Sequence, residues 1–361
     1  MAEYVNMCTE CRQCLDMCPT YVLKGDLPYS PLGRVKAAKK AFQGECSEEV
    51  IESLYTCPLC YACNFVCPLN LDIVEVVEQA RAELVKRGFA LFPAHRRVID
   101  NILKKGNAMG GERYKRLEWL PEKHQEENSS TLLYVGCLAS YVERSIASAV
   151  YLILRKAGIK FKLLQDEGCC GIYIYRAGDL SLAKEVFEKI AAKFREAGVK
   201  EVIVPCLGCY RCFKNYYPRL LGKVDFKVQH FVPLLHKLVK EGALNLRKLG
   251  GRVAYFDPCY LGRAEGMYEE PREILRECGV EVVEMEASRE KSFCCGAGGG
   301  VKSLFPSLAT SLAAKTLDMT AEKTIVTSCI FCTYQFKSVI RELKLDKNVL
   351  HIAELVLKSM C

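Results

Sequence analysis

Residues 8–19 read CTECRQCLDMCP, and residues 57–68 read CPLCYACNFVCP. Both stretches have the spacing C-x2-C-x2-C-x3-C followed by proline. Gaps of two residues let three thiolates reach one metal centre, while the proline turn holds the fourth cysteine away from it. Zinc usually takes two C-x2-C pairs that lie well apart. Four cysteines in eleven residues therefore favour an iron–sulfur cluster over a zinc ion.

This spacing is that of the two-cluster ferredoxins, where the fourth cysteine of each run binds the other cluster. It predicts two cubane [4Fe-4S] clusters, and the cysteines that bind them follow from the spacing. They are Cys8, Cys11, Cys14 and Cys67 for one cluster, and Cys57, Cys60, Cys63 and Cys18 for the other. Between the runs, residues 33–42 and 47–54 have helical apolar spacing. Residues 1–88 are thus expected to form a helical ferredoxin domain.

Composition excludes several classes of protein. The chain has 22 cysteines in 361 residues but no apolar leader, which argues against a secreted disulfide protein. The formal charge of +8 ignores thiolates, and basic residues alternate with acidic ones, so nucleic acid is not an expected partner. No window has the ~18 to 20 apolar residues of a membrane-spanning helix. Residues 89–130 are expected to be a helical linker, with Trp119 packing against the ferredoxin domain.

The remainder of the chain is an internal duplication. Cys137 and Cys259 are 122 residues apart, and His230 and His351 are 121 apart. A constant offset of this size indicates two copies of one module, placed at residues 131–245 and 246–361. In both copies short β-branched runs alternate with helical periods. The first has expected strands at 131–137, 160–164 and 201–206, so each copy reads as a small α/β module with cysteines at strand ends.

Each module carries five cysteines in an unusual pattern. The first set is Cys137, Cys169, Cys170, Cys206 and Cys209, and the second set is Cys259, Cys294, Cys295, Cys329 and Cys332. Five thiolates exceed the four that a zinc ion or one cubane needs, which suggests a non-standard cluster. A zinc site that uses four of the five, or vicinal redox disulfides, are the alternatives. Cys46, Cys212, Cys278 and Cys361 have no counterpart in register and are interpreted as non-ligands.

This pattern resembles the cysteine-rich CCG domain of heterodisulfide reductases and their relatives. Two such domains behind a ferredoxin domain are the layout of the D-type subunit of heterodisulfide reductase. The resemblance implies a noncubane [4Fe-4S] cluster in each module. The five cysteines of each set would bind the cluster of their own module, so all ten are expected to be catalytic ligands. It also implies a disulfide substrate such as the coenzyme M and coenzyme B heterodisulfide. Iron–sulfur subunits of glycolate, lactate and glycerol-3-phosphate dehydrogenases share the architecture.

Two functions follow as hypotheses. The first is a thiol-disulfide oxidoreductase subunit, in which electrons enter at the cubanes and leave to a disulfide. The second is a non-catalytic relay for a flavin-dependent hydroxy-acid dehydrogenase. No dinucleotide fingerprint accompanies the cysteines, so the donor is expected in another subunit, a flavoprotein or a membrane cytochrome b. The expected location is cytoplasmic, or peripheral on the inner face of the membrane. Lys302 and Arg263 are candidates for holding an anionic substrate, although solvated surface roles are favoured.

Overall fold

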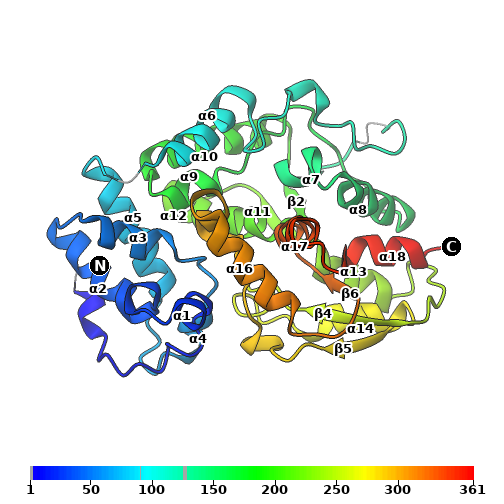
Figure 1. Ribbon diagram of the computed structural model, residues 1–361. Coiled ribbons are helices and arrows are strands. Elements are labelled where there is room, and N and C mark those ends of the chain that lie inside the picture. Colours follow the sequence, from blue (N-terminus) through cyan, green and yellow to red (C-terminus); the bar gives the residue numbers. More distant parts are fainter. Residues whose placement is uncertain (1–2, 90, 125–127) are drawn as a thin grey trace.

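The computed structural model describes residues 3–89, 91–124 and 128–361. Figure 1 shows a helical N-terminal part beside two α/β modules that lie one above the other. The expected fold class, a helical ferredoxin-like region followed by two α/β modules, is confirmed. Among the described residues, no helix combines the length and the apolar character needed to cross a lipid bilayer.

Within residues 3–89, the N-terminal part is built from short α-helices and 3-10 turns. They are η1 (Tyr4–Met7), α1 (Pro19–Lys24), η2 (Leu27–Tyr29), α2 (Pro31–Gln43), α3 (Glu48–Tyr55), α4 (Ala62–Val66) and α5 (Ile73–Lys86). The side chains of Ser30 and Asp72 cap α2 and α5 by accepting a backbone N–H from the first turn. Leu54, Val77 and Leu84 are fully buried between these helices. The helices predicted at 33–42 and 47–54 are therefore present as α2 and α3.

The linker contains α6 (Pro93–Lys105) and a 3-10 turn, η3 (Arg113–Lys115). Trp119 is buried, but its ring packs edge-on against Tyr151 of the first module, with centroids 5.9 Å apart. Its carbonyl accepts a hydrogen bond from Ser148 of the same module. The expectation that Trp119 packs against the ferredoxin domain is wrong, because the chain after α6 runs along the outside of the first module.

The first module holds a parallel sheet of order β1-β2-β3. Its elements are β1 (Thr131–Leu133), α7 (Cys137–Tyr141), α8 (Arg144–Lys156), α9 (Ile172–Ala177), α10 (Leu180–Glu196), β2 (Glu201–Val204), α11 (Leu207–Arg211), a π-helical turn η4 (Cys212–Tyr216), α12 (Tyr217–Leu221), β3 (Lys227–His230) and α13 (Phe231–Lys240). The strand predicted at residues 160–164 is reduced to a single bridge between Lys162 and Leu132. Only Phe161 of that stretch is fully buried, so a longer strand would cover little apolar surface.

The second module repeats the arrangement with a full fourth strand, in the parallel order β5-β4-β6-β7. Its elements are β4 (Arg252–Phe256), α14 (Glu269–Glu277), β5 (Glu281–Glu284), η5 (Arg289–Lys291), η6 (Gly298–Gly300), α15 (Val301–Leu304), α16 (Pro306–Leu317), β6 (Thr324–Thr327), α17 (Ile330–Leu343), β7 (Asn348–His351) and α18 (Ile352–Ser359). In Figure 1, α16 runs toward the N-terminal part, and Leu23 of α1 packs against its buried face.

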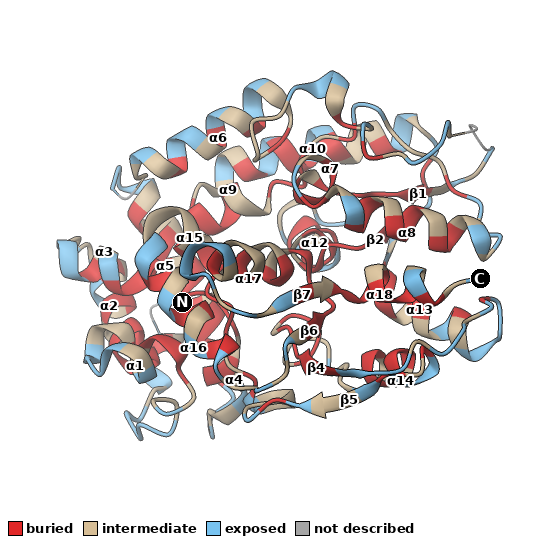
Figure 2. Cartoon of the chain, turned by 45° about the vertical axis from the view of Figure 1, so that its right-hand side comes forward, coloured by how far each residue is buried: buried red, intermediate tan, exposed pale blue. Residues whose placement is uncertain are grey.

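The two modules are joined by their last helices, which cross over to the other copy. Helix α18 of the second module packs on α8 of the first, and α13 of the first packs on α14 of the second. Across the join, Lys337 pairs with Glu143 at 2.8 Å, and His236 with Glu273 at 2.8 Å. Figure 2 shows buried residues along the strands and on the inward faces of these helices. The modules therefore share one continuous core.

One buried guanidinium ties the N-terminal part to both modules. Arg81 of α5 is fully buried and donates to the carbonyls of Leu54 (2.8 Å) and Cys57 (2.9 Å) in its own domain. It also donates to Arg176 of the first module (3.1 Å) and to Gly299 of the second (2.8 Å). These carbonyls lie at or near the ends of short helices and turns, where few backbone donors are available. The Leu54 carbonyl also accepts the backbone N–H of Cys57, at 3.4 Å. Arg81 thus satisfies polar groups at the point where three parts of the chain meet.

We expect Arg81→Lys to lower the stability of the protein by about 3 kcal/mol, because one ammonium replaces a planar group that reaches several buried carbonyls at once. The matched control is Arg87→Lys at the end of the same helix, where the side chain is half-exposed and pairs only with Glu83. The control is expected to cost below about 1 kcal/mol. Urea unfolding of anaerobically prepared protein measures both, and equal midpoints for the two variants would contradict the role of Arg81.

Candidate functional site

All ten module cysteines line a single cavity of about 360 Å³ between the two modules. They lie where the sheets place functional loops, at the carboxyl ends of parallel strands. Cys206 follows β2 and Cys329 follows β6, while Cys137 and Cys259 follow β1 and β4. Because the modules face each other with these edges together, the two sets of five occupy opposite walls of the same space.

The first set forms one connected chain of thiols. The thiols lie close enough that each one shifts the pKa of the next, in the order Cys137, Cys169, Cys170, Cys209 and Cys206. The adjacent pair Cys169 and Cys170 therefore connects Cys137 at one end of the set with Cys209 and Cys206 at the other. A tight turn at the flanking glycines makes this possible, as neighbouring side chains in extended backbone point apart.

The second set forms an equivalent chain with one difference. Contacts link Cys294 to Cys295, Cys295 to Cys332 at 3.2 Å, and Cys332 to Cys329. The thiol of Cys294 also contacts Cys60, which comes from the N-terminal part of the chain. Cys259 packs against this pair. The second set is thus in direct contact with a cysteine of the ferredoxin-like region.

Burial disfavours unpaired negative charge on these thiols. It raises the pKa of Cys259 to about 12, and burial is also the main reason that the pKa of Cys57 and Cys63 is raised. Two thiols are exceptions: hydrogen bonds from Cys294 and Cys332 lower the pKa of Cys295 to about 6, and a hydrogen bond with Cys209 lowers the pKa of Cys206. Thiolates become stable in such a setting when bound iron supplies positive charge. A buried donor set made of thiols alone therefore fits iron–sulfur clusters.

A buried ion pair fixes the loops that carry the first set. Glu167, two residues before Cys169, accepts the backbone N–H groups of Val135 and Gly136, each at 2.9 Å. These two residues directly precede Cys137. The same carboxylate pairs with Arg116 of the linker, and both side chains are buried. One carboxylate thereby holds the loop of Cys137 against the loop of the cysteine pair.

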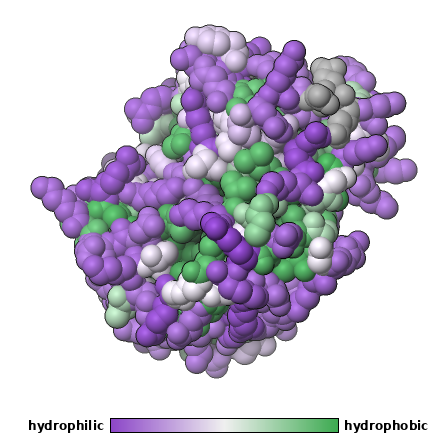
Figure 3. All heavy atoms as spheres, turned by 90° about the vertical axis from the view of Figure 1, so that its right-hand side faces the viewer, coloured by the Kyte–Doolittle hydropathy of each residue, from purple (hydrophilic) through white to green (hydrophobic). Residues whose placement is uncertain are grey.

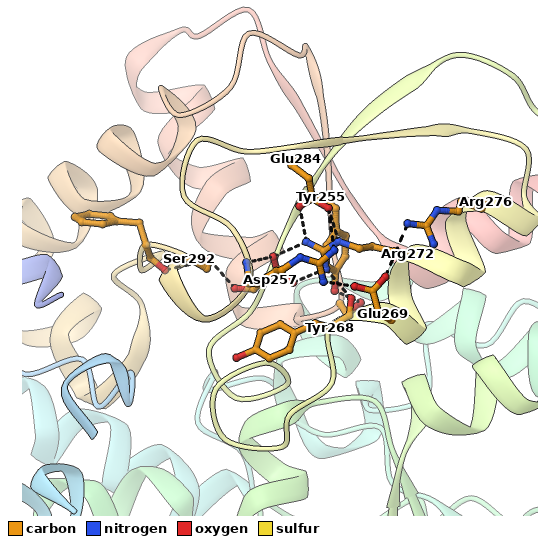
Figure 4. Close-up of polar contacts among 11 residues, drawn as sticks. Tyr255, Asp257, Tyr268, Glu269, Arg272, Arg276, Glu284 and Ser292 are labelled. Atoms are coloured by element: carbon orange, nitrogen blue, oxygen red, sulfur yellow. Dashed lines mark hydrogen bonds and ion pairs between the residues drawn. The ribbon is translucent and has the colours of Figure 1, made fainter. Parts of the chain in front are cut away.

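In the second module, the buried ion pair that fixes the cysteine loops is formed by Asp257 and Arg272. Figure 4 shows this pair at the centre of a polar network. Arg272 is fully buried and donates to both oxygens of Asp257, at 2.7 and 2.8 Å, and to both oxygens of Glu284. The hydroxyl of Ser292 donates to the Asp257 carbonyl at 2.9 Å. Asp257 lies two residues before Cys259, and Ser292 two before Cys294. The Asp257 carboxylate also accepts the backbone N–H of Arg289, on the loop that leads to Cys294, at 2.7 Å. The carboxylate thus sits on the other loop in this module, but it joins the same two segments.

In the N-terminal part, Cys18, Cys57, Cys60 and Cys63 line one small internal cavity together with Arg34. Arg34 is buried and donates to the sulfur of Cys18 at 3.3 Å and to the hydroxyl of Thr20 at 2.7 Å. A cation donating to a ligand sulfur stabilises negative charge there and raises the reduction potential of a cluster. The structure therefore brings together the four cysteines that the spacing assigns to one cubane.

The other four cysteines lie toward the surface. Cys8, Cys14 and Cys67 are half-buried and pack against the helical core, and Cys11 is exposed. Burial raises the pKa of Cys14 to about 11, and its neighbours Cys18, Cys8 and Cys11 contribute to that rise. The assignment of Cys67 to this group stays a prediction.

Glycines let the N-terminal part approach the second module closely. A side chain at Gly298 would place its Cβ 2.4 Å from the carbonyl of Pro58, and one at Gly299 would lie 2.3 Å from that of Cys57. Gly299 also has φ +61°, which favours glycine. The glycines after the second cysteine pair thus open space for the loop that carries Cys57 and Cys60.

Several other residues singled out in the sequence have structural places. His230 and His351 are buried and accept the N–H of Val232 and Ala353 at the start of α13 and α18, as helix caps do. The side chain of Arg263 donates to the carbonyls of Cys60 and Ser292. Cys212 is fully buried and donates to the carbonyl of Cys170 at 3.2 Å.

Sequence reasoning did not find Arg34, Arg81, Arg116 or Arg272, which act on the site through buried contacts. None of them stands in a motif, and a lone arginine carries no sign of burial in the sequence. Among the described residues, no group of three His, Cys, Asp or Glu side chains is arranged to hold a single metal ion.

Comparison with known proteins agrees with this geometry. Residues 131–214 and 253–337 match the family model described as a cysteine-rich domain, CCG, and residues 4–71 match the 4Fe-4S dicluster domain. The chain is 31% identical to the D-type subunit of dihydromethanophenazine:CoB–CoM heterodisulfide reductase from Methanosarcina mazei, over 99% of this chain and 94% of that protein.

Two further proteins are similar to this chain over a smaller share of their length or at a lower sequence identity. An EtfAB:quinone oxidoreductase of Syntrophomonas wolfei is 31% identical, over 86% of this chain but 47% of that protein. A hypothetical protein from Helicobacter pylori has a similar crystal structure, with a TM-score of 0.56 at 13% identity, over 91% of this chain and 68% of that one. The high coverage of the Methanosarcina protein, together with the dicluster domain and two CCG domains, shows that this chain belongs to the family of iron–sulfur oxidoreductase proteins formed by the D-type subunits of heterodisulfide reductase.

Proposed function

We propose that this protein reduces a disulfide in the cavity between its two modules, with electrons that arrive through the N-terminal part. The observation that carries the proposal is the meeting of both five-cysteine sets on one cavity. A duplicated fold could have placed each set in a pocket of its own. A shared space instead lets both sets act on one small molecule.

The proposed ligands follow the four groups of cysteines. Cys8, Cys11, Cys14 and Cys67 would hold one cubane, and Cys18, Cys57, Cys60 and Cys63 the other. Each five-cysteine set would hold a noncubane [4Fe-4S] cluster. The shared cavity of the second cubane group and the continuous thiol contacts within each module set support these assignments.

Reduction of a disulfide consumes two electrons and two protons and releases two thiols. When bound, iron–sulfur clusters would supply one-electron transfer, and one cluster held by each cysteine set could provide one of the two electrons. The contact between Cys60 and Cys294 supports the second module as the point where electrons would arrive from the ferredoxin-like region. The apolar walls around the cysteines, such as Leu138 and Phe331, exclude water from the cavity.

The electron donor is expected to be another protein of the complex, either a flavoprotein or a membrane cytochrome b, that docks on the N-terminal part. Cys11 is exposed there, and Met7, Phe65 and Leu69 near the same cysteines are exposed hydrophobic residues. Such a surface beside a cluster shortens the path to a partner. With such a donor, the proposed location of the protein is the cytoplasm or the inner face of a membrane.

The similarity to a protein named EtfAB:quinone oxidoreductase favours a second candidate function, a relay without disulfide chemistry. Both functions use the same clusters but differ in their electron acceptor. Anaerobic protein with about sixteen irons per chain, as four [4Fe-4S] clusters require, should oxidise reduced viologen only when a disulfide is added if the first proposal holds. Iron near that value without any disulfide-dependent oxidation would support the relay.

We expect Cys294→Ala to lower the iron content by about four per chain and to abolish disulfide-dependent oxidation of reduced viologen. The matched control is Cys278→Ala. Cys278 is equally buried in the second module, but its sulfur accepts a hydrogen bond only from Ser359. Iron analysis and the viologen assay compare the two variants. Full iron and activity in Cys294→Ala would contradict the proposed ligand set.

We expect Gly299→Ala to slow electron transfer from the N-terminal clusters to the modules, because the new Cβ would meet the Cys57 carbonyl. Gly266→Ala is the matched control, since Gly266 also has positive φ but open space around it. Both variants carry about 1 kcal/mol of backbone strain. Stopped-flow reoxidation of the reduced protein by a disulfide measures the rate. Equal rates with unchanged iron would argue against this junction as the route.

A further inference from the structure

We infer that Lys302 donates a proton to one of the thiolates that form when a disulfide is reduced in the cavity between the modules. Lys302 belongs to α15 of the second module, and its side chain lines that cavity. The inference rests on the proposed function, because it names the residue that supplies one of the two protons that disulfide reduction consumes. The role does not depend on any charge of the substrate.

The reaction needs protons as well as electrons. Two electrons break the sulfur–sulfur bond and leave two thiolates, and each thiolate takes up one proton to become a thiol. The Lys302 ammonium transfers one proton to one thiolate sulfur and becomes a neutral amine. It regains a proton from solvent, to which this half-buried side chain remains partly exposed. The second thiolate takes its proton from solvent as it leaves.

Few groups in the cavity can supply the first proton. Among the described residues, no Asp or Glu lines the cavity. The lining side chains other than cysteine that carry an exchangeable proton are His95, Tyr173, Arg176, Tyr260, Lys302, Ser303 and Tyr334.

Most of these groups are unsuitable as donors. Arg176 keeps its charge at any ordinary pH. The Tyr260 hydroxyl is buried, and His95 is 1% exposed with its ring packed against three aromatic rings. The hydroxyls of Tyr173 and Ser303 bond to each other at 2.7 Å, and Ser303 donates onward to a backbone carbonyl.

Neighbouring residues of the second module hold the Lys302 ammonium in place. Gln335 is fully buried, and its Nε2 donates to the carbonyl of Ala309 at 2.9 Å. This bond orients the amide so that its oxygen accepts from Lys302. The ammonium also lies 4.8 Å from the ring centroid of Tyr334. Because an ammonium has three N–H donors, the bond to Gln335 leaves others for a group in the cavity.

The chemistry of a lysine suits this transfer better than that of a neutral hydroxyl such as Tyr334. An ammonium attracts the thiolate that it protonates. Ordinary pKa values are about 10.4 for lysine and about 8.5 for a thiol, so the proton moves between groups of similar basicity. Burial lowers the pKa of Lys302, which makes it a stronger acid, while Cys295 and Glu342 act in the opposite direction.

Other elements add little charge around Lys302. Glu342 belongs to α17, and Cys295 to the loop of the adjacent cysteine pair. Helices α6 and α16 pack on α15. The first contributes the buried His95, and the second has Lys315 as its one charged residue, which is exposed. The ammonium is therefore the form of Lys302 expected at neutral pH.

The donor belongs to the second module alone. Lys302 stands seven residues after Cys295, and the corresponding position after Cys170 is Ala177. Gln335 stands three residues after Cys332, where the first module has Cys212 after Cys209. Both members of the pair thus differ in the first module, so one wall of the cavity carries the proton donor.

The test removes the proton but keeps the charge. Lys302→Arg retains a cation that does not release a proton, and Lys302→Met removes both. Anaerobic holoprotein is assayed with reduced methyl viologen and bis(2-hydroxyethyl) disulfide, a neutral oxidant with no charge for Lys302 to bind. We expect kcat to fall about a hundredfold in both variants, with KM within about twofold of wild type. Lys315→Arg is the matched control and should keep the wild-type kcat.

Chemical rescue and pH dependence examine the same proton. Ethylammonium should restore part of kcat in Lys302→Ala, whereas tetramethylammonium, which has the charge but no transferable proton, should not. In wild type, kcat should fall as the pH rises through the pKa of Lys302, because the donating ammonium is lost there. Lys302→Arg should lack this fall.

Measurements without turnover exclude an effect on the clusters. Iron content, and the EPR-monitored reduction of the clusters by viologen in the absence of disulfide, should match wild type in every Lys302 variant. Less iron or slower cluster reduction in Lys302→Arg would overturn the inference, since the residue would then act on the clusters. A wild-type kcat in Lys302→Arg would also overturn it, because the charge alone would suffice.

The same assays separate this inference from the proposed function. If wild type reduces the disulfide and Lys302→Arg does so equally fast, the reductase function stands and the proton donor alone fails. If wild-type protein with a full iron content reduces no disulfide, the reductase function fails and the inference falls with it.

Discussion

The position of Arg81 is the constraint on which the arrangement of the site depends. A guanidinium without access to water must find acceptors for its donors, and here those acceptors come from three parts of the chain. Satisfying this one group therefore fixes the ferredoxin-like region against both modules. It also places the loop of Cys57 and Cys60 beside the glycines that follow the second cysteine pair. Any geometry that moved these parts separately would leave a buried charge unpaired.

Buried ion pairs continue this arrangement inside each module. Glu167 with Arg116, and Asp257 with Arg272, each tie a loop that carries a single cysteine to the loop that carries the adjacent pair. Both modules connect these two loops through a carboxylate, but the carboxylate stands on opposite loops in the two modules. The positions of the ligands were thus kept while their supports diverged. Figure 3 shows the outer side of the join, where hydrophobic residues gather in the middle of the face and hydrophilic ones surround them.

The duplication is also unequal in its chemistry. Cys212 of the first module has Gln335 as its counterpart in the second, and Gln335 accepts from Lys302 instead of lying against a cysteine loop. The contact with Cys60 belongs to the second module alone among the thiol contacts described. The two similar units therefore differ in position, because one contacts the ferredoxin-like region through Cys294 and the other lies across the cavity. Across the cavity, Arg176 of the first module lies over the ring of Tyr260 of the second, 4.8 Å from the ring centroid.

Cysteine spacing by itself predicted the ferredoxin-like region and the duplication, because cluster binding demands fixed numbers of thiolates at fixed separations in the chain. The four groups of ligands that the spacing suggests stay a prediction. Helices α2 and α3 followed equally from local apolar periodicity. The partner of Trp119 and the loss of the strand at residues 160–164 did not, since both depend on what packs against them. Only the tertiary structure decided that both cysteine sets share one cavity and that Arg81 joins the ferredoxin-like region to both modules. Burial and the pairing of donors depend on contacts between segments far apart in sequence, so no local sequence pattern predicts them.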